Sequence, residues 1–261
     1  MMLKIINNFL REKTLLNSLP RYIIFKILNI KYLKKYNTLY GSFYLPFFAF
    51  KDVIRNSIIN NEIYDEEVYN AAKKHIRPNS IVLDIGSNFG QMSILWSKVK
   101  AGVQVYSFEA SSYIFKILKK NIEINSANVK AFNNIVGNHS DKLFYISKSN
   151  LDKYTSYGSN KIIFTKEKKN FDKIKSIKID DIEFNQNISV MKVDVQGLDL
   201  DVLKGAKETI KKYQMPIIFE YDKVFEKDFD YTFKDFENFF EEIKYKKISK
   251  IDKSNYLIEK E

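Results

Sequence analysis

The sequence predicts an α/β protein built on a mostly parallel sheet with helices on both faces. After Pro78, short β-branched runs alternate with amphipathic helical patterns, which is typical of parallel strands joined by helical crossovers. The chain has 261 residues, 45% of them hydrophobic, which is enough for one large core. It has no cysteine and two histidines, which excludes disulfides and thiolate metal sites and argues against a histidine-rich metal centre.

The N-terminal segment differs from the rest in charge. Residues 1–50 contain eight Lys and Arg against one acid, and their apolar residues recur at partly helical spacing. We therefore expect a basic helical appendage over residues 1–55, followed by the main domain over residues 56–261. The basic excess fits a solvated face, contact with an anionic membrane surface, or a phosphate-bearing substrate.

The main domain starts with a helix over 66–76, which ends before Pro78. The pattern then predicts these elements in order: strand 81–85, helix 90–100, strand 103–109, helix 112–125 and strand 129–135. Residues 141–178 are polar and lysine-rich with short apolar pieces, which predicts an insertion of antiparallel strands laid over the sheet. After it we expect strand 188–195, helix 198–212, strand 215–221, helix 231–243 and a terminal strand near 256–258.

The stretch "IVLDIGSNFG", residues 81–90, joins the first strand to its helix. The strand ends in Asp84, and Gly86 and Gly90 let a ligand approach backbone N–H groups at the helix start. Glu109 ends the next strand, where a carboxylate can accept both hydroxyls of a ribose. Together these residues predict a nucleoside site at the carboxyl edge of the sheet.

The glycine spacing decides between nucleoside cofactors. Asn88 stands where the dinucleotide motif G-x-G-x-x-G has its middle glycine, so a pyrophosphate would be crowded out. S-adenosylmethionine has no phosphate and fits better. We expect the turn amides to meet its amino acid part and Asp84 to face its ammonium. The alternative is a tight strand-to-helix turn with a purely structural role.

The blocks "IVLDIGSNFG", "VYSFEA" and "VMKVDVQGLDLDVLKGA" keep an order and spacing that resemble the FkbM family of S-adenosylmethionine-dependent methyltransferases. The resemblance covers residues from about 60 to 221. It implies a class I methyltransferase fold, which is Rossmann-like, with a seven-stranded sheet whose last strand is antiparallel. It also implies methyl transfer, usually to a hydroxyl of a sugar or a small metabolite.

The resemblance also implies roles for single residues. The methionine part of the cofactor would be held by Asp84, Gly86, Ser87, Asn88 and Gly90, the ribose by Glu109 and Ala110, and the adenine rim by Asn134, Ile135 and Val136. Asp194 would sit beside the sulfonium. Gln196 departs from the family, which commonly has Glu there, so any role of an acid at this position is in doubt.

Transfer to a hydroxyl also needs a proton acceptor. We expect Asp194 to act as the base, assisted by the charge of Lys192, and we consider Glu220 a second candidate. Alternatively, Asp194 has the structural role of capping the helix that follows. Asp194 and Glu220 could also bind Mg²⁺, although nothing in the sequence demands a metal. We place the acceptor beneath the insertion, at Asn150, Tyr154 and Ser156, which a polar loop would explain equally well.

Three functions remain open at the level of sequence. The first is O-methylation of a sugar hydroxyl in a surface glycan or its precursor, or of another small molecule. The second is a nucleic-acid methyltransferase, which the charge permits but which lacks an N-P-P-Y-like stretch. The third is a non-catalytic binding module, suggested by Gln196. No apolar run is long enough to span a bilayer, and no secretory signal is recognisable, so we expect a cytoplasmic protein, with peripheral contact at the inner face of the membrane as a further expectation.

Overall fold

The computed structural model describes residues 33–47, 49–147 and 171–260. The acceptor residues expected from sequence, Asn150, Tyr154 and Ser156, lie outside these ranges, as does most of the basic N-terminal segment. Within the described ranges, no helix is both long enough and apolar enough to pass through a bilayer.

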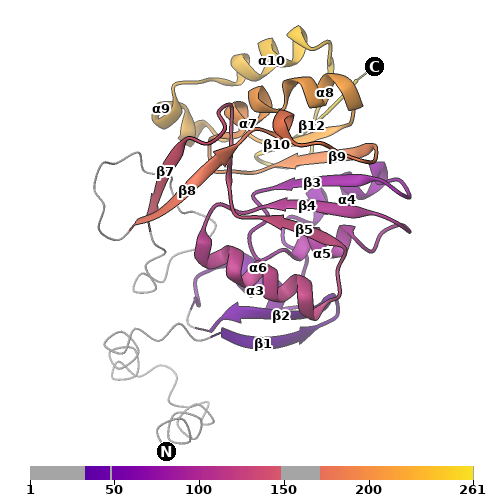
Figure 1. Ribbon diagram of the computed structural model, residues 1–261, viewed down its shortest axis with the longest axis vertical. Coiled ribbons are helices and arrows are strands. Elements are labelled where there is room, and N and C mark those ends of the chain that lie inside the picture. The colour runs from indigo at the N-terminus through magenta and orange to yellow at the C-terminus, as the bar shows by residue number, and fades with distance from the viewer. Residues whose placement is uncertain (1–32, 48, 148–170, 261) are drawn as a thin grey trace, which may run out of the picture.

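A seven-stranded sheet forms the centre of the molecule (Figure 1). Its strands, in spatial order, are β11 (Lys247–Lys250), β12 (Asn255–Glu259), β10 (Ile217–Glu220), β9 (Ile188–Val193), β3 (Ile81–Ile85), β4 (Gln104–Phe108) and β5 (Val129–Phe132). Of these, β12 runs antiparallel to both its neighbours, whereas β5, β4, β3, β9 and β10 are parallel. This confirms the class I methyltransferase topology predicted from the sequence.

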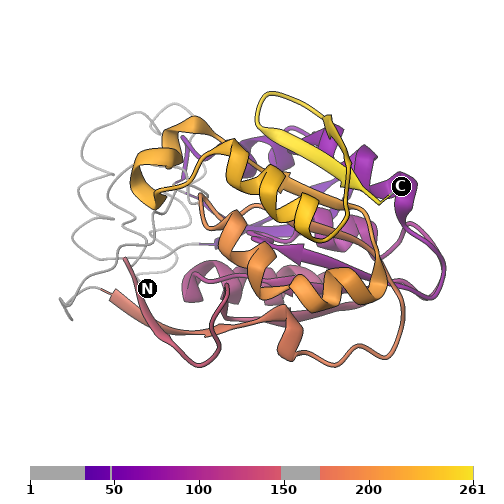
Figure 2. The ribbon, with the colours of Figure 1, turned by 90° about the horizontal axis from the view of Figure 1, so that it is seen from above.

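Helices cover both faces of the sheet because its buried strands alternate their side chains between two apolar layers. Leu83 of β3 packs with the layer of α7 (Asp199–Gly205), α8 (Lys207–Tyr213) and α10 (Phe233–Glu242). Its neighbour Val82 packs on the opposite side with Trp96, in the layer of α4 (Glu66–His75) and α5 (Gln91–Trp96). Figure 2 shows the orange and yellow helices lying together over one side of the sheet.

A β-hairpin occupies the described part of the N-terminal segment, where the sequence predicted helix. β1 (Leu33–Thr38) pairs antiparallel with β2 (Gly41–Pro46), and α3 (Val53–Ile59) follows. Two local features favour strands over a helix. Gly41 has a φ of +131° at the turn, and Phe43 and Leu45 are buried with a period of two. The helical spacing that motivated the prediction lies in residues 15–27, outside the described ranges.

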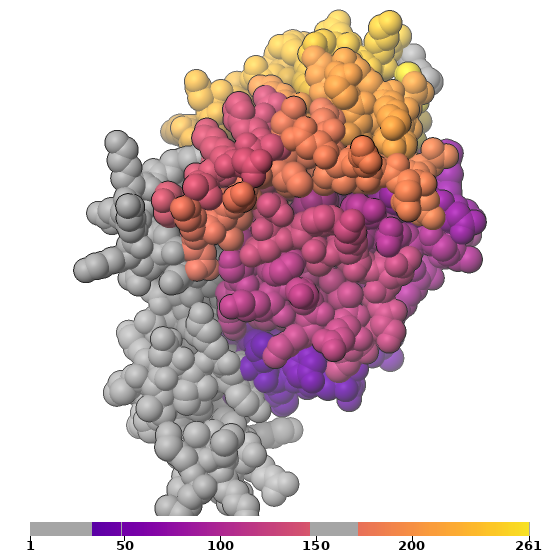
Figure 3. All heavy atoms as spheres, viewed as in Figure 1, coloured from indigo at the N-terminus to yellow at the C-terminus, as the bar shows by residue number. Residues whose placement is uncertain are grey.

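The hairpin is fastened to α6 (Ser112–Ile124) by the buried amide of Asn121. Its Oδ1 accepts from Tyr44 N–H at 2.7 Å, and its Nδ2 donates to Phe89 O at 2.9 Å, in the turn after β3. Apolar side chains of the hairpin, α3, α5 and α6 form one shared cluster that includes Phe43, Ile58 and Ile117. In Figure 3 the indigo hairpin lies directly against the magenta middle of the chain.

The insertion is a small sheet beside the main one. β7 (Leu143–Ser147) and β8 (Phe171–Ile177) are antiparallel, as predicted, and β6 (Ile135–Val136) joins β8 in parallel. Of the two apolar pieces noted in the sequence, "KLFYIS" contains β7, whereas "KIIFTK" lies outside the described ranges. Three short helices, η3 (Ile179–Asp181), η4 (Lys223–Phe225) and α9 (Glu226–Phe229), complete the described chain.

Candidate active site

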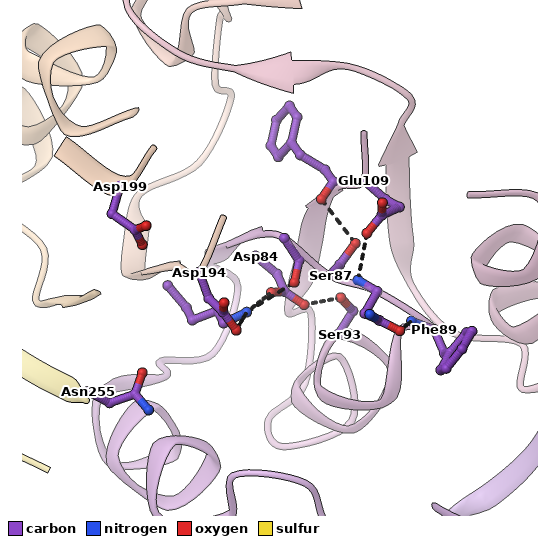
Figure 4. Close-up of polar contacts among 12 residues, drawn as sticks. Asp84, Ser87, Phe89, Ser93, Glu109, Asp194, Asp199 and Asn255 are labelled. Carbon is purple, nitrogen blue, oxygen red and sulfur yellow. Dashed lines mark hydrogen bonds and ion pairs between the residues drawn. The ribbon is translucent and has the colours of Figure 1, made fainter. Parts of the chain in front are cut away.

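A cavity of about 600 Å³ lies where β3, β4, β9 and β10 end at their carboxyl sides. Nine of the ten residues expected at a cofactor line it, namely Asp84, Gly86, Ser87, Asn88, Glu109, Ala110, Asn134, Ile135 and Val136. Lys192, Asp194 and Glu220 line it as well, so the fold brings the expected catalytic group to the same place. In the view of Figure 4, Glu109 and Asp194 lie on either side of Asp84.

The two glycines of the turn serve different contacts, although both have a φ of +85°. A Cβ on Gly86 would lie 1.8 Å from the carbonyl oxygen of Asp194, so a glycine is needed where the turn meets the end of β9. A Cβ on Gly90 would lie 2.4 Å from Cδ1 of Leu118 in α6. Gly90 does not line the cavity, so its role is to pack the start of α5 against α6.

The turn amides do not face a ligand, contrary to the expectation from sequence. Each N–H from 86 to 90 donates inside the protein: Gly86 and Ser87 to Phe108 O, Asn88 to Glu109 Oε2, Phe89 to Asn88 Oδ1, and Gly90 to Ser87 O. Asn88 has a φ of +49°, which lets its own side chain accept from the next residue. Side chains must therefore bind the amino acid part of a ligand in this cavity.

Glu109 is held in place by two backbone groups. Oε1 accepts from Ser111 N–H at 2.7 Å and Oε2 accepts from Asn88 N–H at 3.0 Å. Burial raises the pKa of Glu109 to about 7, against the opposing effect of these two hydrogen bonds. The carboxylate is fixed in orientation and keeps lone pairs for further donors, as recognition of a ribose requires.

Asp84 is completely buried, and its carboxylate faces the protein's own groups. Oδ2 accepts from the hydroxyl of Ser93, which in turn accepts from Ser107 Oγ at 2.6 Å. Oδ1 lies 3.7 Å from Lys192 Nζ, because the two residues are opposite each other in the register of β3 and β9. Burial raises the pKa of Asp84, while Lys192 and Ser93 act in the other direction. That Asp84 faces a ligand ammonium stays a prediction: Lys192 already brings one ammonium to Oδ1, although Oδ1 itself has no hydrogen-bond partner among the described residues.

Lys192 is a buried cation with three oxygen neighbours. Its Nζ donates to Gly86 O at 3.1 Å and lies 3.1 Å from Asp194 Oδ2, in addition to its contact with Asp84. Burial alone would lower the pKa of Lys192, but the carboxylates of Asp194 and Asp84 outweigh it and raise the pKa above its ordinary value. Lys192 therefore stays charged and cannot accept a proton.

Asp194 and Glu220 are two carboxyl groups in different states. The side chain of Asp194 is 25% exposed and paired with Lys192. Glu220 Oε2 is buried, with no hydrogen-bond partner among the described residues. Burial, followed by the charge of Asp194, raises the pKa of Glu220 to about 9. The protonated form of Glu220 is therefore favoured at neutral pH.

The arrangement of Asp194 and Glu220 does not fit a site for a divalent cation. In the described part of the chain, no group of three or more His, Cys, Asp or Glu side chains is placed to hold a metal ion. Of the pair named for Mg²⁺, Asp194 already contacts the ammonium of Lys192. Hard cations prefer several free oxygen ligands, which this pair does not offer.

Two segments that the sequence analysis missed also line the cavity. One is the loop before α4 with Tyr64 and Asp65, and the other is the turn 252–255 between β11 and β12. Gln91, the first residue of α5, ties the first loop in place: it accepts from Tyr64 N–H at 3.0 Å and donates to Glu62 O at 2.7 Å. The first segment lies within the stretch that resembles the FkbM family, but its residues carried no expected role, because both segments reach the site only through tertiary contacts.

The family model of the methyltransferase FkbM domain matches residues 84–247, which is more than half of the chain. The chain belongs to the FkbM methyltransferase family. The match starts at Asp84 and spans the turn, Glu109 and the segment from Lys192 to Glu220, so it includes most of the residues that line the cavity but neither the loop before α4 nor the turn 252–255. No curated protein matches the chain.

Solved structures similar to this FkbM chain include a methyltransferase FkbM from Methylobacillus flagellatus, with 13% identity and a TM-score of 0.46. The similarity covers 94% of this chain and 60% of that one. A precorrin-6y C5,15-methyltransferase from Geobacter metallireducens has 12% identity, covers 75% and 88% of the two chains, and gives a TM-score of 0.44. M. jannaschii TYW2, in complex with AdoMet, has 12% identity, covers 88% and 85%, and gives 0.42.

Proposed function

We propose that the protein is an S-adenosylmethionine-dependent methyltransferase that methylates a hydroxyl of a sugar in a surface glycan or its precursor. One observation carries the proposal: the turn of the FkbM domain, Glu109 and Asp194 line a single cavity of about 600 Å³. Ligand cavities of roughly this size hold a nucleoside-sized cofactor.

The residues of the cavity fit S-adenosylmethionine. Glu109 presents a fixed carboxylate for the ribose hydroxyls, and Ile135 and Val136 offer an apolar wall for the adenine. Seven carboxylic side chains but only two lysines line the cavity, an excess that favours a cationic ligand. When bound, the cofactor would supply a methyl group already activated on a sulfonium sulfur.

In the proposed reaction, the acceptor oxygen gains the methyl group and loses its proton to Asp194. Lys192 fixes the Asp194 carboxylate from behind at 3.1 Å and cannot compete for the proton, because its pKa is raised. Glu220 is already protonated and donates rather than accepts. Alignment of acceptor and methyl group supplies most of the rate enhancement in such a displacement, so we assign Lys192 and Glu220 positioning roles.

The acidic lining also favours one acceptor class over another. A nucleic acid would bring phosphates toward the carboxylates of Asp65 and Asp194, and like charges repel. A sugar hydroxyl brings no charge. We therefore favour a sugar over a nucleic acid. A non-catalytic binding module would not require a partly exposed carboxylate held next to a buried cation.

Calorimetry with S-adenosylhomocysteine and with NAD tests the cofactor class. We expect the first to bind and the second not to bind, and the reverse result would remove the methyltransferase proposal. The acceptor is tested by mass spectrometry of glycans from cells that carry the intact protein, Asp194→Asn, or Asp141→Asn. Asp141 pairs with Lys175 at 3.2 Å on the surface, which makes it a matched control.

We further propose that Asp194→Asn removes a methyl mark that Asp141→Asn preserves. The mark should reappear when intact protein is restored. Retention of every methylated sugar in cells with Asp194→Asn would exclude Asp194 as the base, provided that the variant still binds S-adenosylhomocysteine.

The site of action is proposed from charge alone. The excess of Lys and Arg over residues 1–50 favours peripheral contact with an anionic membrane surface on the cytoplasmic side. Sedimentation of the full chain with anionic and with neutral vesicles at low salt measures this contact, and equal recovery with both would exclude it.

A further inference from the structure

The cavity still lacks a partner for one charged group of the proposed cofactor. S-adenosylmethionine carries an α-ammonium on its methionine part, and buried or half-buried ammonium groups are bound through charge-assisted hydrogen bonds. The acid expected to bind it, Asp84, is completely buried, with Lys192 next to one carboxylate oxygen and Ser93 bonded to the other. The carbonyl of Gly86 is occupied as well, because it accepts from Lys192.

The other acidic side chains that line the cavity differ in the partners that their carboxyl groups already have. Glu109 is placed for the ribose, and Glu220 holds a proton at neutral pH. Asp194 lies 3.1 Å from a cation of its own and is the proposed base. Asp252 accepts from the N–H groups of Ser254 and Asn255, and Glu67 is exposed to solvent. Asp65 is half-buried, and its carboxylate makes no hydrogen bond or ion pair with any residue that the structure describes.

Asp65 is also in an unusual position for a residue that precedes a helix. It occupies the N-cap of α4 with a φ of +51°, yet its side chain does not cap the helix. The side chain lines the cavity instead and lies within electrostatic reach of Asp194 and Lys192. Burial and the charge of Asp194 raise its pKa to about 6, so the group is still mostly ionised at neutral pH.

The loop that carries Asp65 is rigidly attached to the cofactor turn. The Gln91 amide bonds to Tyr64 N–H and Glu62 O, and Gln91 follows Gly90 directly in the chain. Asp65 is therefore positioned by the same element that positions the turn, as binding of one end of a small ligand requires.

We propose that the carboxylate of Asp65 binds the α-ammonium of the methionine part of S-adenosylmethionine. This inference rests on the proposed function. Lys192 excludes the ammonium from Asp84 by charge repulsion, and Asp65 provides an unpaired negative charge on another wall of the same cavity. The cofactor would then contact two acids far apart in the sequence, Glu109 at its ribose and Asp65 at its ammonium.

Two commercially available ligands separate binding of the amino acid part, which carries the ammonium, from binding of the nucleoside. S-adenosylhomocysteine contains it, whereas 5′-methylthioadenosine has the same nucleoside and sulfur but no amino acid part. We expect Asp65→Asn to weaken S-adenosylhomocysteine at least about tenfold in calorimetry, as loss of a charge-assisted hydrogen bond predicts. The affinity for 5′-methylthioadenosine should not change. Glu66→Gln, at the exposed neighbouring carboxylate that does not line the cavity, is the control and should bind both ligands as the intact protein does.

A second variant separates binding from folding. Asp65→Gly suits the positive φ and should not lower the thermal stability, but it removes the carboxylate and should weaken the same ligand. If both variants bind S-adenosylhomocysteine as tightly as the intact protein, Asp65 does not bind the ammonium, while the proposed function stands. Equal weakening of both ligands would also overturn the inference. If the intact protein binds neither ligand, the proposed function itself fails.

Discussion

Asp84 and Lys192 face each other across β3 and β9, with Lys192 Nζ 3.7 Å from Asp84 Oδ1 and both side chains almost fully inaccessible to water. The pair forms the floor of the cavity. Because Lys192 also contacts Asp194 and Gly86 O, one cation connects the floor, the turn and the proposed base.

The stability of the Lys192→Met variant, compared with that of the intact protein, tests this connection. Removing one partner of a buried pair leaves the other uncompensated, and such changes cost about 3–5 kcal/mol. Asp84 would then stay protonated in the folded protein, so the variant should lose stability as the pH rises above the ordinary pKa of an aspartate. Urea unfolding at several pH values measures both effects.

Lys234→Met is the control for this experiment. Lys234 lies 3.2 Å from Glu237 on the surface, where an ion pair contributes at most about 1 kcal/mol. If Lys192→Met lowers the free energy of unfolding no more than Lys234→Met does, the buried pair does not support the floor of the cavity.

Glu109 should make cofactor binding depend on pH near neutrality. Its pKa is about 7 in the folded protein, and the ionised form is the better acceptor for ribose hydroxyls. The affinity for 5′-methylthioadenosine should therefore rise about tenfold from pH 6 to pH 8. This ligand lacks the amino acid part, so Asp65 does not contribute. Glu109→Gln should bind more weakly and without this dependence, and an unchanged pH profile in that variant would contradict the assignment.

Glu220 should make the protein less stable as the pH rises. Its folded pKa of about 9 lies above the ordinary value of 4.5, so the unfolded chain ionises first and stability falls through this window. Glu220→Gln keeps the shape and cannot ionise. Its stability relative to the intact protein should therefore increase from pH 5 to pH 9 in urea unfolding. Glu237→Gln, at an exposed acid, is the control, and a parallel gain there would refute the explanation.

Gly86→Ala should damage the site more than Gly90→Ala. Both residues have a positive φ, so each substitution strains the backbone by about 1 kcal/mol or more. At Gly86, however, the new methyl group would meet the backbone carbonyl of Asp194, whereas at Gly90 it would meet the end of a Leu118 side chain that can move. Binding of S-adenosylhomocysteine by the two variants compares the effects, and equal affinities would contradict the prediction.

The sheet was predictable because each strand carries its own signal. The runs at 81–85 and 188–193 are rich in Ile and Val and are buried along their whole length, so local pattern alone indicates parallel strands. The cavity position followed from the same signal, because ligands bind at the carboxyl ends of such strands. Glu109 was predictable for that reason.

The partners of the polar groups were not predictable in the same way. Asp84 and Lys192 are far apart in the sequence, and only the register of β3 and β9 brings them together. The turn amides look free in the sequence, yet Phe108 O accepts two of them from the neighbouring strand. Asp65 lies within the stretch that resembles the FkbM family, but nothing in its local spacing predicted a role. Whether a backbone N–H bonds to an internal acceptor or to a ligand depends on which strands lie next to each other. The local sequence around the N–H does not show this.

The amide of Asn121 has a consequence for how this protein can be divided. It serves Tyr44 in the hairpin and Phe89 in the cofactor turn at once, so both depend on one side chain of α6. A chain shortened to begin at residue 56 would expose the apolar surface around Ile117 and leave that amide with its hairpin partner missing. Removing the N-terminal strands would therefore also disturb the support of the turn that precedes α5.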